Sequence, residues 1–171
     1  MKEKRYIKVT RDGKVFHQLR EVKVKEESKL KEHLHLLQSI TSGKQQLFFE
    51  WQFNNSKECK VEKTPKEIKK GKPQIKQCYQ NSVDVVLLNE NVKYCEGFVL
   101  FMGIPIEHAW NKIDDKYFDV TSDFALKDRG GLKGEEYLSI VELSKEELRQ
   151  VYKRGDYQSI TSKVFIKKQN I

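Results

Sequence analysis

The sequence predicts an α+β domain in which a helix packs on an antiparallel β-sheet. Between residues 78 and 89, apolar side chains recur at the spacing of an α-helix, at Tyr79, Val83, Val86 and Leu87. From residue 94 to residue 121 the apolar period becomes two, which is typical of half-buried strands. The chain has 171 residues, which is enough for one domain with a sizeable core.

The alternating segment divides into three strands joined by short turns. We expect these strands at residues 94–102, 105–113 and 116–121. If Asp114 and Asp115 form a two-residue loop, His108 and Asp119 become diagonal neighbours on one face of the sheet, with backbones roughly 7–8 Å apart. A three-residue loop would place the two side chains on opposite faces. An even loop length is therefore required if the two residues are to act together.

The residues before this core predict further strands and a helix. A turn at Asp12-Gly13 is expected to join two strands, and Ser28 is expected to cap a leucine-rich helix that Ser42-Gly43 ends. The aromatic-rich segment 46–53 is expected to be a strand. The lysine-rich stretch that follows is expected to be a loop with a possible short helix at residues 65–70.

The residues after residue 121 predict a strand, a helix and a closing strand. The strands are expected at residues 137–143 and 162–167. Ser144 and Glu147 have the spacing of a capping box, which opens a helix to about residue 154. The glycine-rich segment 128–134 is expected to form a mobile loop that could cover a substrate.

Positive charge is concentrated in the N-terminal part of the chain. Residues 1–73 contain 19 Lys and Arg against 10 Asp and Glu, whereas residues 74–171 contain 14 against 15. We therefore divide the chain into a basic strand-helix-strand extension at 1–73, expected to belong to the same body, and a core at 74–171. A solvated lysine-rich face is the favoured interpretation, and binding of nucleic acid or an acidic protein partner is the alternative.

The three cysteines indicate free thiols in a reducing compartment. Cys59, Cys78 and Cys95 are odd in number and lack metal-type spacing, so we expect no disulfide framework and no metal or other cofactor. The N-terminus has no secretory signal, and the longest apolar run, residues 98–106, is too short to span a bilayer. The sequence therefore predicts a cytoplasmic protein with no membrane contact.

Cys78, His108 and Asp119 are the candidate catalytic residues. A thiol needs a nearby base to become a thiolate at neutral pH, and the base needs a carboxylate that orients it. Cys78 lies where the helical pattern begins, and backbone N–H groups at a helix start favour a thiolate and could hold an oxyanion. A buried structural cysteine and a core histidine are the alternatives. Asp123 is the reserve carboxylate.

These segments resemble the transglutaminase-like superfamily of papain-like-fold enzymes. That family has a Gly-Gln-Cys-Trp-type segment, a His-Ala-Trp strand and an Asp-Pro-Thr-type strand in this order. The corresponding stretches here read Lys76-Gln77-Cys78-Tyr79, His108-Ala109-Trp110 and Asp119-Val120-Thr121, and Tyr94 to Val99 looks like the strand before the family's histidine. The resemblance covers residues 74–124, and Lys76, Tyr79 and Val120 depart from the family's pattern.

The resemblance implies a papain-like fold and a cysteine-dependent acyl-transfer enzyme that acts on amide bonds of a protein or peptide. Hydrolysis, including proteolysis or deamidation, is slightly favoured over transfer to an amine. Gln77 or Gln74 could bind the oxyanion, as upstream glutamines do in papain-like enzymes, or could bond locally. Trp110 could shield the imidazole, line the acyl site or pack in the sheet. The competing prediction is a binding module with an inactive fold of this type.

Overall fold

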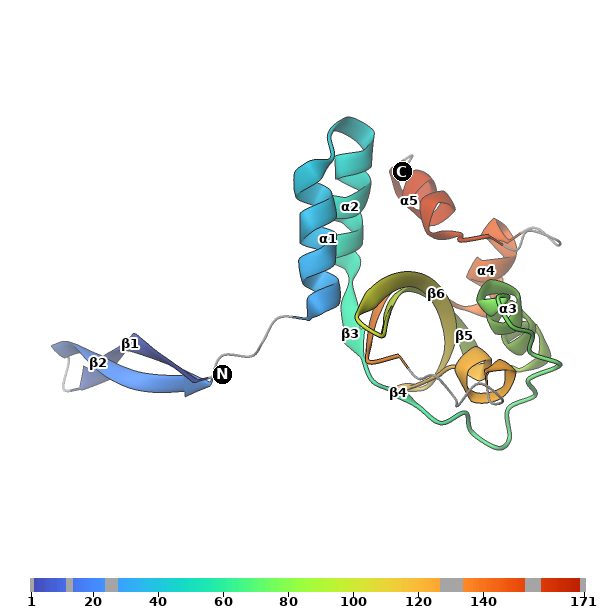
Figure 1. Ribbon diagram of the computed structural model, residues 1–171, viewed down its shortest axis with the longest axis horizontal. Coiled ribbons are helices and arrows are strands. Elements are labelled where there is room, and N and C mark those ends of the chain that lie inside the picture. The colour runs from blue at the N-terminus through green and yellow to red at the C-terminus, as the bar shows by residue number, and fades with distance from the viewer. Residues whose placement is uncertain (1, 12–13, 24–27, 127–133, 153–157, 170–171) are drawn as a thin grey trace.

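The structure is a computed structural model that describes residues 2–11, 14–23, 28–126, 134–152 and 158–169. It contains a curled six-stranded sheet, helices and a separate two-stranded hairpin (Figure 1). The predicted α+β class is therefore confirmed. Within these residues, no helix is long and apolar enough to cross a membrane.

The hairpin at the N-terminus consists of β1 (Lys2–Arg11) and β2 (Lys14–Lys23). Arg11 pairs with Lys14, so the connection has the two-residue length predicted, and its turn residues lie outside the described part of the chain. Among the described residues, the two strands pair only with each other. By contrast, residues 57–62 of the predicted extension belong to the six-stranded sheet.

The six-stranded sheet closes on itself through one short segment. Its order is β3 (Lys57–Cys59), β8 (Glu136–Leu143), β5 (Val92–Phe101), β6 (Ile104–Ile113), β7 (Lys116–Phe118) and β4 (Val61–Glu62). The first and last strands in this order are separated in sequence by Lys60 alone. Since the Cα atoms of Cys59 and Val61 can lie at most about 7 Å apart, the two edges of the sheet must meet there.

Both hairpins of the central strands have two-residue loops. Phe101 pairs with Ile104, and Ile113 pairs with Lys116 across Asp114-Asp115. Asp114 has a φ of 51°, which suits the left-handed turns that match the twist of a hairpin. The even loop required by the sequence analysis is thus confirmed. The strand expected at 116–121 is shorter than predicted: β7 ends at Phe118, and the π-helix η1 (Thr121–Ala125) follows.

The helix α3 (Cys78–Leu88) covers the outer face of the sheet. Its buried valines join Tyr94, Ala109 and Phe118 in the main core. A second, smaller apolar cluster lies on the other face, inside the curl, and contains Cys95, Val99, Trp110, Tyr117 and Tyr137. The strand β5 has core residues on both faces, which explains its nearly continuous burial.

The prediction of a strand at 46–53 is wrong. This segment belongs to the helix α2 (Gly43–Asn55), which follows α1 (Lys29–Ile40). Aromatic residues have a high propensity for strands, but in this helix their rings can contact both the main core and α5. Phe49, Trp51 and Phe53 pack against the main core, and the rings of Phe48 and Trp51 also contact Phe165. Tertiary packing therefore decides the secondary structure of this segment.

The closing strand expected at 162–167 is also wrong, because residues 161–169 form the helix α5 (Thr161–Gln169). The buried carboxylate of Glu96 accepts hydrogen bonds from the backbone N–H groups of Ile160 and Thr161, each at 3.1 Å, and so caps the helix. This partner is 64 residues away in sequence, so local patterns cannot reveal it.

Two smaller expectations have different outcomes. The capping box of Ser144 and Glu147 is confirmed at the start of α4 (Lys145–Val151). No helix forms at 65–70, where the chain makes only a turn closed by the Ile68 N–H and the Pro65 carbonyl. Of the loop expected at 128–134, all but Gly134 lies outside the described residues.

Candidate active site

Cys78 is the first residue of α3, as the apolar spacing predicts, and its side chain is half-buried. Gln77 precedes it with non-helical angles, and the first backbone bond of the helix joins the Asn81 N–H to the Gln77 carbonyl at 2.8 Å. The N–H groups of the first helical turn, at residues 78–80, therefore have no partner within the helix. They surround the thiol with positive partial charge.

Lys76 turns the chain into this helix through a left-handed backbone, with a φ of 63°. This conformation costs a non-glycine residue roughly 1–2 kcal/mol, while glycine adds about 0.5–1 kcal/mol of chain entropy. We expect Lys76→Gly to raise the free energy of unfolding by up to about 1 kcal/mol in urea titrations. Lys72→Gly, at an exposed residue with negative φ, is the control and should not stabilise the protein. Equal effects of the two changes would contradict the strain argument.

His108 lies on β6 and faces into the curl of the sheet. Its Nε2 lies 2.8 Å from Asp119 Oδ2, and only 7% of the residue is exposed. The ring stacks on Trp110, with centroids 6.2 Å apart, and meets the edge of Phe101 at 5.9 Å. Because a carboxylate accepts the hydrogen on Nε2, Nδ1 is the nitrogen left to exchange a proton with another group.

The Asp119 carboxylate accepts five hydrogen bonds from the described residues. Its Oδ1 accepts from the backbone N–H groups of Thr121, at 2.9 Å, and Ser122, at 3.1 Å. Its Oδ2 accepts from the Ser122 hydroxyl at 2.6 Å and the Tyr137 hydroxyl at 3.1 Å, in addition to His108. The first three of these donors belong to η1. Because β7 ends at Phe118, the chain turns into η1 directly after Asp119, and these donors hold the carboxylate in position.

The Cys78 thiol completes the cluster. It lies close enough to the His108 ring to help raise the pKa of the imidazole. Burial by itself would lower the pKa of His108, but Asp119 and Cys78 together raise it to about 10. Burial by itself would raise the pKa of Asp119, but His108 and Ser122 hold it below its usual range. The raised pKa of His108 and the lowered pKa of Asp119 both favour an imidazolium beside a carboxylate.

These shifts predict how stability depends on pH. The raised pKa of His108 stabilises the fold fully below about pH 6.5, and this contribution is lost as the pH rises toward 10. The lowered pKa of Asp119 stabilises the fold above about pH 4, and this is lost in acid. In Cys78→Ala, where the ring takes no proton from a thiol, we expect the free energy of unfolding to fall by up to about 1.4 kcal/mol per pH unit between pH 6.5 and 8. His108→Gln should flatten this slope in urea titrations, and an unchanged slope would contradict the assignment.

The other two thiols are in environments that suppress ionisation. Burial raises the pKa of Cys59 to about 12, and burial raises that of Cys95 well above its usual value. Cys95 is completely buried in the inner cluster. The thiolate is the nucleophilic form of cysteine, so neither residue is suited to attack a substrate at neutral pH.

Two residues that the sequence analysis did not single out hold the cluster in place. Asn81 is buried one turn after Cys78; its side chain bonds to both backbone groups of Gln74, at 2.8 and 2.9 Å, and to the Thr121 hydroxyl at 3.0 Å. It thus ties the loop before the thiol to the turn after Asp119. Tyr137, on β8, is the second of these residues. The sequence signal that could have indicated both residues is a polar side chain on the buried face of a predicted helix or strand.

The weaker candidates lie as follows. Gln77 makes no side-chain capping bond to α3, and Gln74 is exposed, with its backbone held by Asn81. Trp110 is completely buried against the His108 ring, which places it where it excludes water from the imidazole. The reserve carboxylate, Asp123, accepts hydrogen bonds from the Thr64 N–H and hydroxyl, at 2.7 and 2.6 Å.

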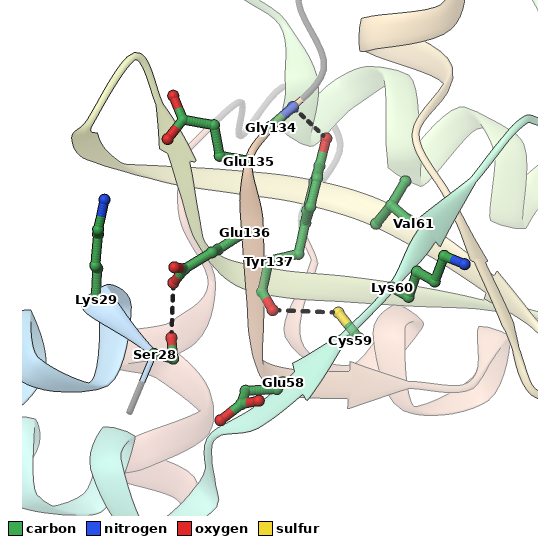
Figure 2. A pocket seen from close by; sticks show the side chains of 10 residues that line it. All are labelled: Ser28, Lys29, Glu58, Cys59, Lys60, Val61, Gly134, Glu135, Glu136 and Tyr137. Carbon is green, nitrogen blue, oxygen red and sulfur yellow. Dashed lines mark hydrogen bonds between the residues drawn. The ribbon is translucent and has the colours of Figure 1, made fainter. Parts of the chain in front are cut away.

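Figure 2 shows a cavity of about 440 Å³ that none of the three candidate catalytic residues lines and that is linked to them through Tyr137. The ring of Tyr137 forms part of its wall, and the hydroxyl of the same residue bonds to Asp119. Cys59 lines the cavity too, with its thiol 3.8 Å from the Tyr137 carbonyl. In the part of the chain that the structure describes, no three His, Cys, Asp or Glu side chains gather as a metal site.

Comparisons with known proteins do not assign this chain to a family. No family model matches it, and no curated protein or solved structure is significantly similar to it. The geometry of Cys78, His108 and Asp119 is therefore the basis for a functional assignment.

Proposed function

We propose that the chain is a cysteine-dependent acyl-transfer enzyme of transglutaminase-like type, with a papain-like fold. The observation that carries the proposal is the His108–Asp119 hydrogen bond of 2.8 Å, made by the same ring that interacts with the Cys78 thiol. The base and its orienting carboxylate support this proposal through that hydrogen bond, and the thiol that acts on the same ring would be the nucleophile. The substrate class is an amide bond of a protein or peptide.

The reaction would run through a thioester. Nδ1 of His108 holds the proton taken from Cys78 in the resting enzyme, as the raised pKa of the imidazole favours, and the thiolate attacks the amide carbon while N–H groups at the start of α3 hold the oxyanion. His108 then returns the proton to the leaving amine, and the C–N bond breaks. Water attacks the thioester next, with His108 as base, to release an acid and restore the thiol; an amine in place of water would give transamidation.

Asp119 has two roles in this scheme. It holds one proton on Nε2, so that the proton taken from the thiol resides on Nδ1, and its charge stabilises the imidazolium. Trp110 excludes water from the ring, which strengthens both interactions. Hydrolysis is favoured over transfer to an amine because water is always present.

Alkylation of individual cysteines tests the proposal without a known substrate. We expect iodoacetamide at pH 7 to label Cys78 at least 10-fold faster than Cys59 or Cys95, as read by peptide mass spectrometry. His108→Gln should remove this advantage, while circular dichroism verifies that the variant is folded. If Cys78 labels no faster than Cys59 in the folded protein, the acyl-transfer function is wrong, and a binding module becomes the favoured function.

A further inference from the structure

The hairpin of β1 and β2 is a pair of strands that belongs to no larger sheet. Figure 1 shows it standing apart from the six-stranded sheet and its helices, and among the described residues its strands pair only with each other. A two-stranded hairpin is marginally stable in water unless further strands or a helix pack against it. The hairpin is therefore a candidate for binding another molecule.

The register of the hairpin places positive charges opposite one another. Three of its cross-strand pairs join two cations: Lys2 with Lys23, Arg5 with Arg20, and Arg11 with Lys14. Like charges that lie directly opposite destabilise a strand pair, whereas apolar pairs such as Val9 with Phe16 stabilise it. A polyanion that neutralised the cations would remove this repulsion.

The cations occupy both faces of the ribbon that the two strands form. Residues 2–11 and 14–23 contain eight Lys and Arg against two Glu, which is most of the chain's net charge of +8. Successive residues of a strand alternate between its faces, so the register divides the cations equally. One face has Lys2, Lys4, Lys8 and Lys23, and the other has Arg5, Arg11, Lys14 and Arg20. This distribution matches a partner that carries negative charge on two sides of the ribbon.

The dimensions of the ribbon match the major groove of DNA. Each strand has 10 residues and spans about 33 Å, which is close to the length of one turn of the double helix. The groove is about 12 Å wide, admits a two-stranded β-ribbon and has phosphates along both walls. A bilayer surface or an acidic helix would present its charge to one face only. The major groove of an RNA duplex is too narrow for such a ribbon.

We propose that the hairpin of β1 and β2 binds double-stranded DNA by lying in the major groove, where its cations pair with phosphates of both strands. Phosphate contacts carry no sequence information, so binding depends little on base sequence and falls steeply as salt is added. The hairpin does not contain Cys78, His108 or Asp119, so this binding is independent of the proposed acyl transfer.

Fluorescence anisotropy of a labelled DNA duplex of about 20 base pairs tests the proposal with the full chain. We expect a Kd of about 1–100 μM at a salt concentration of about 150 mM. Arg5→Gln combined with Arg20→Gln should weaken binding about 10-fold and reduce the slope of log K against log salt by about 2. Lys63→Gln combined with Lys66→Gln is the matched control, because it removes two exposed cations outside the hairpin, and it should leave both quantities unchanged.

A second double variant keeps the charge of the hairpin. Arg5→Lys combined with Arg20→Lys should bind within about threefold of wild type, because a phosphate contact needs the charge rather than the guanidinium. Retained binding in this variant shows that the glutamine substitutions act through charge and not through loss of the hairpin. If the lysine and glutamine variants lose affinity equally, the proposed phosphate pairing is wrong.

Three further results would overturn the proposal. Equal loss of affinity in the Lys63 and Lys66 control would show that DNA is attracted by the net charge of the chain and not by the hairpin. An RNA duplex of the same sequence should bind about 10-fold more weakly than DNA, and equal binding would exclude the major groove as the site. Polyglutamate that binds as tightly as the DNA duplex would identify an acidic protein as the partner instead.

Discussion

Asp119→Ala is expected to lower the free energy of unfolding by about 3–5 kcal/mol, because it removes one partner of a buried charged pair. It leaves the His108 ring, two backbone N–H groups and the hydroxyls of Ser122 and Tyr137 without their acceptor. In a chain of 171 residues this corresponds to a fall in Tm of roughly 10 °C. Urea titrations at pH 7 measure the change.

Asp123→Ala is the matched control for this prediction. It removes a neighbouring carboxylate that, among the described residues, accepts two bonds, both from Thr64, so a loss of about 1–2 kcal/mol is expected. Asp119→Ala should also slow alkylation of Cys78, because the imidazole loses the group that orients it, whereas Asp123→Ala should not. Equal losses of stability in the two variants would contradict the central position given to Asp119.

Gly97→Ala is expected to cost about 3 kcal/mol or more, because a Cβ at this residue would lie 2.0 Å from the Leu138 carbonyl oxygen. Gly97 sits at the β-bulge between β5 and β8 and directly opposite His108 on β6. The obstructing atom is backbone, so the strands must move apart. We expect a lower urea midpoint and slower alkylation of Cys78.

Gly103→Ala separates steric contact from backbone conformation. Gly103 has a φ of 75° in the turn between β5 and β6, but no atom lies within 4 Å of an added Cβ. Its replacement should cost only the left-handed penalty of about 1–2 kcal/mol and leave the reactivity of Cys78 unchanged. If the two glycine variants are equally stable, the bulge tolerates a side chain and the close approach has no energetic consequence.

The predicted site follows from patterns among residues that are close together in the sequence. A helix beginning at Cys78 follows from the spacing of its apolar residues, and a two-residue loop at Asp114-Asp115 follows from turn chemistry. Strand parity then places His108 and Asp119 on one face, where their side chains lie 2.8 Å apart. Each step uses the identity of neighbouring residues, so one sequence is enough.

The errors of the sequence analysis fall where a distant partner chooses between helix and strand. Residues 46–53 have the composition of a strand but form part of α2, because Phe165 and the main core offer two separate faces for their aromatic rings. Residues 162–167 form part of α5, whose start is capped by Glu96. Asn81 and Tyr137 escaped notice because the partners that link them to the site, Thr121 and Asp119, lie 40 and 18 residues away.

The sequence by itself determined the α+β class, the helix that opens with Cys78 and the parity that brings His108 to Asp119, because period, caps and turns are local properties of the chain. Only the tertiary structure decided that the sheet closes through residues 57–62, that η1 surrounds Asp119 with donors and that Lys168 of α5 lies over the Trp51 ring of α2. Those features depend on contacts between residues far apart in the chain, and their free energy appears only when the whole core is assembled.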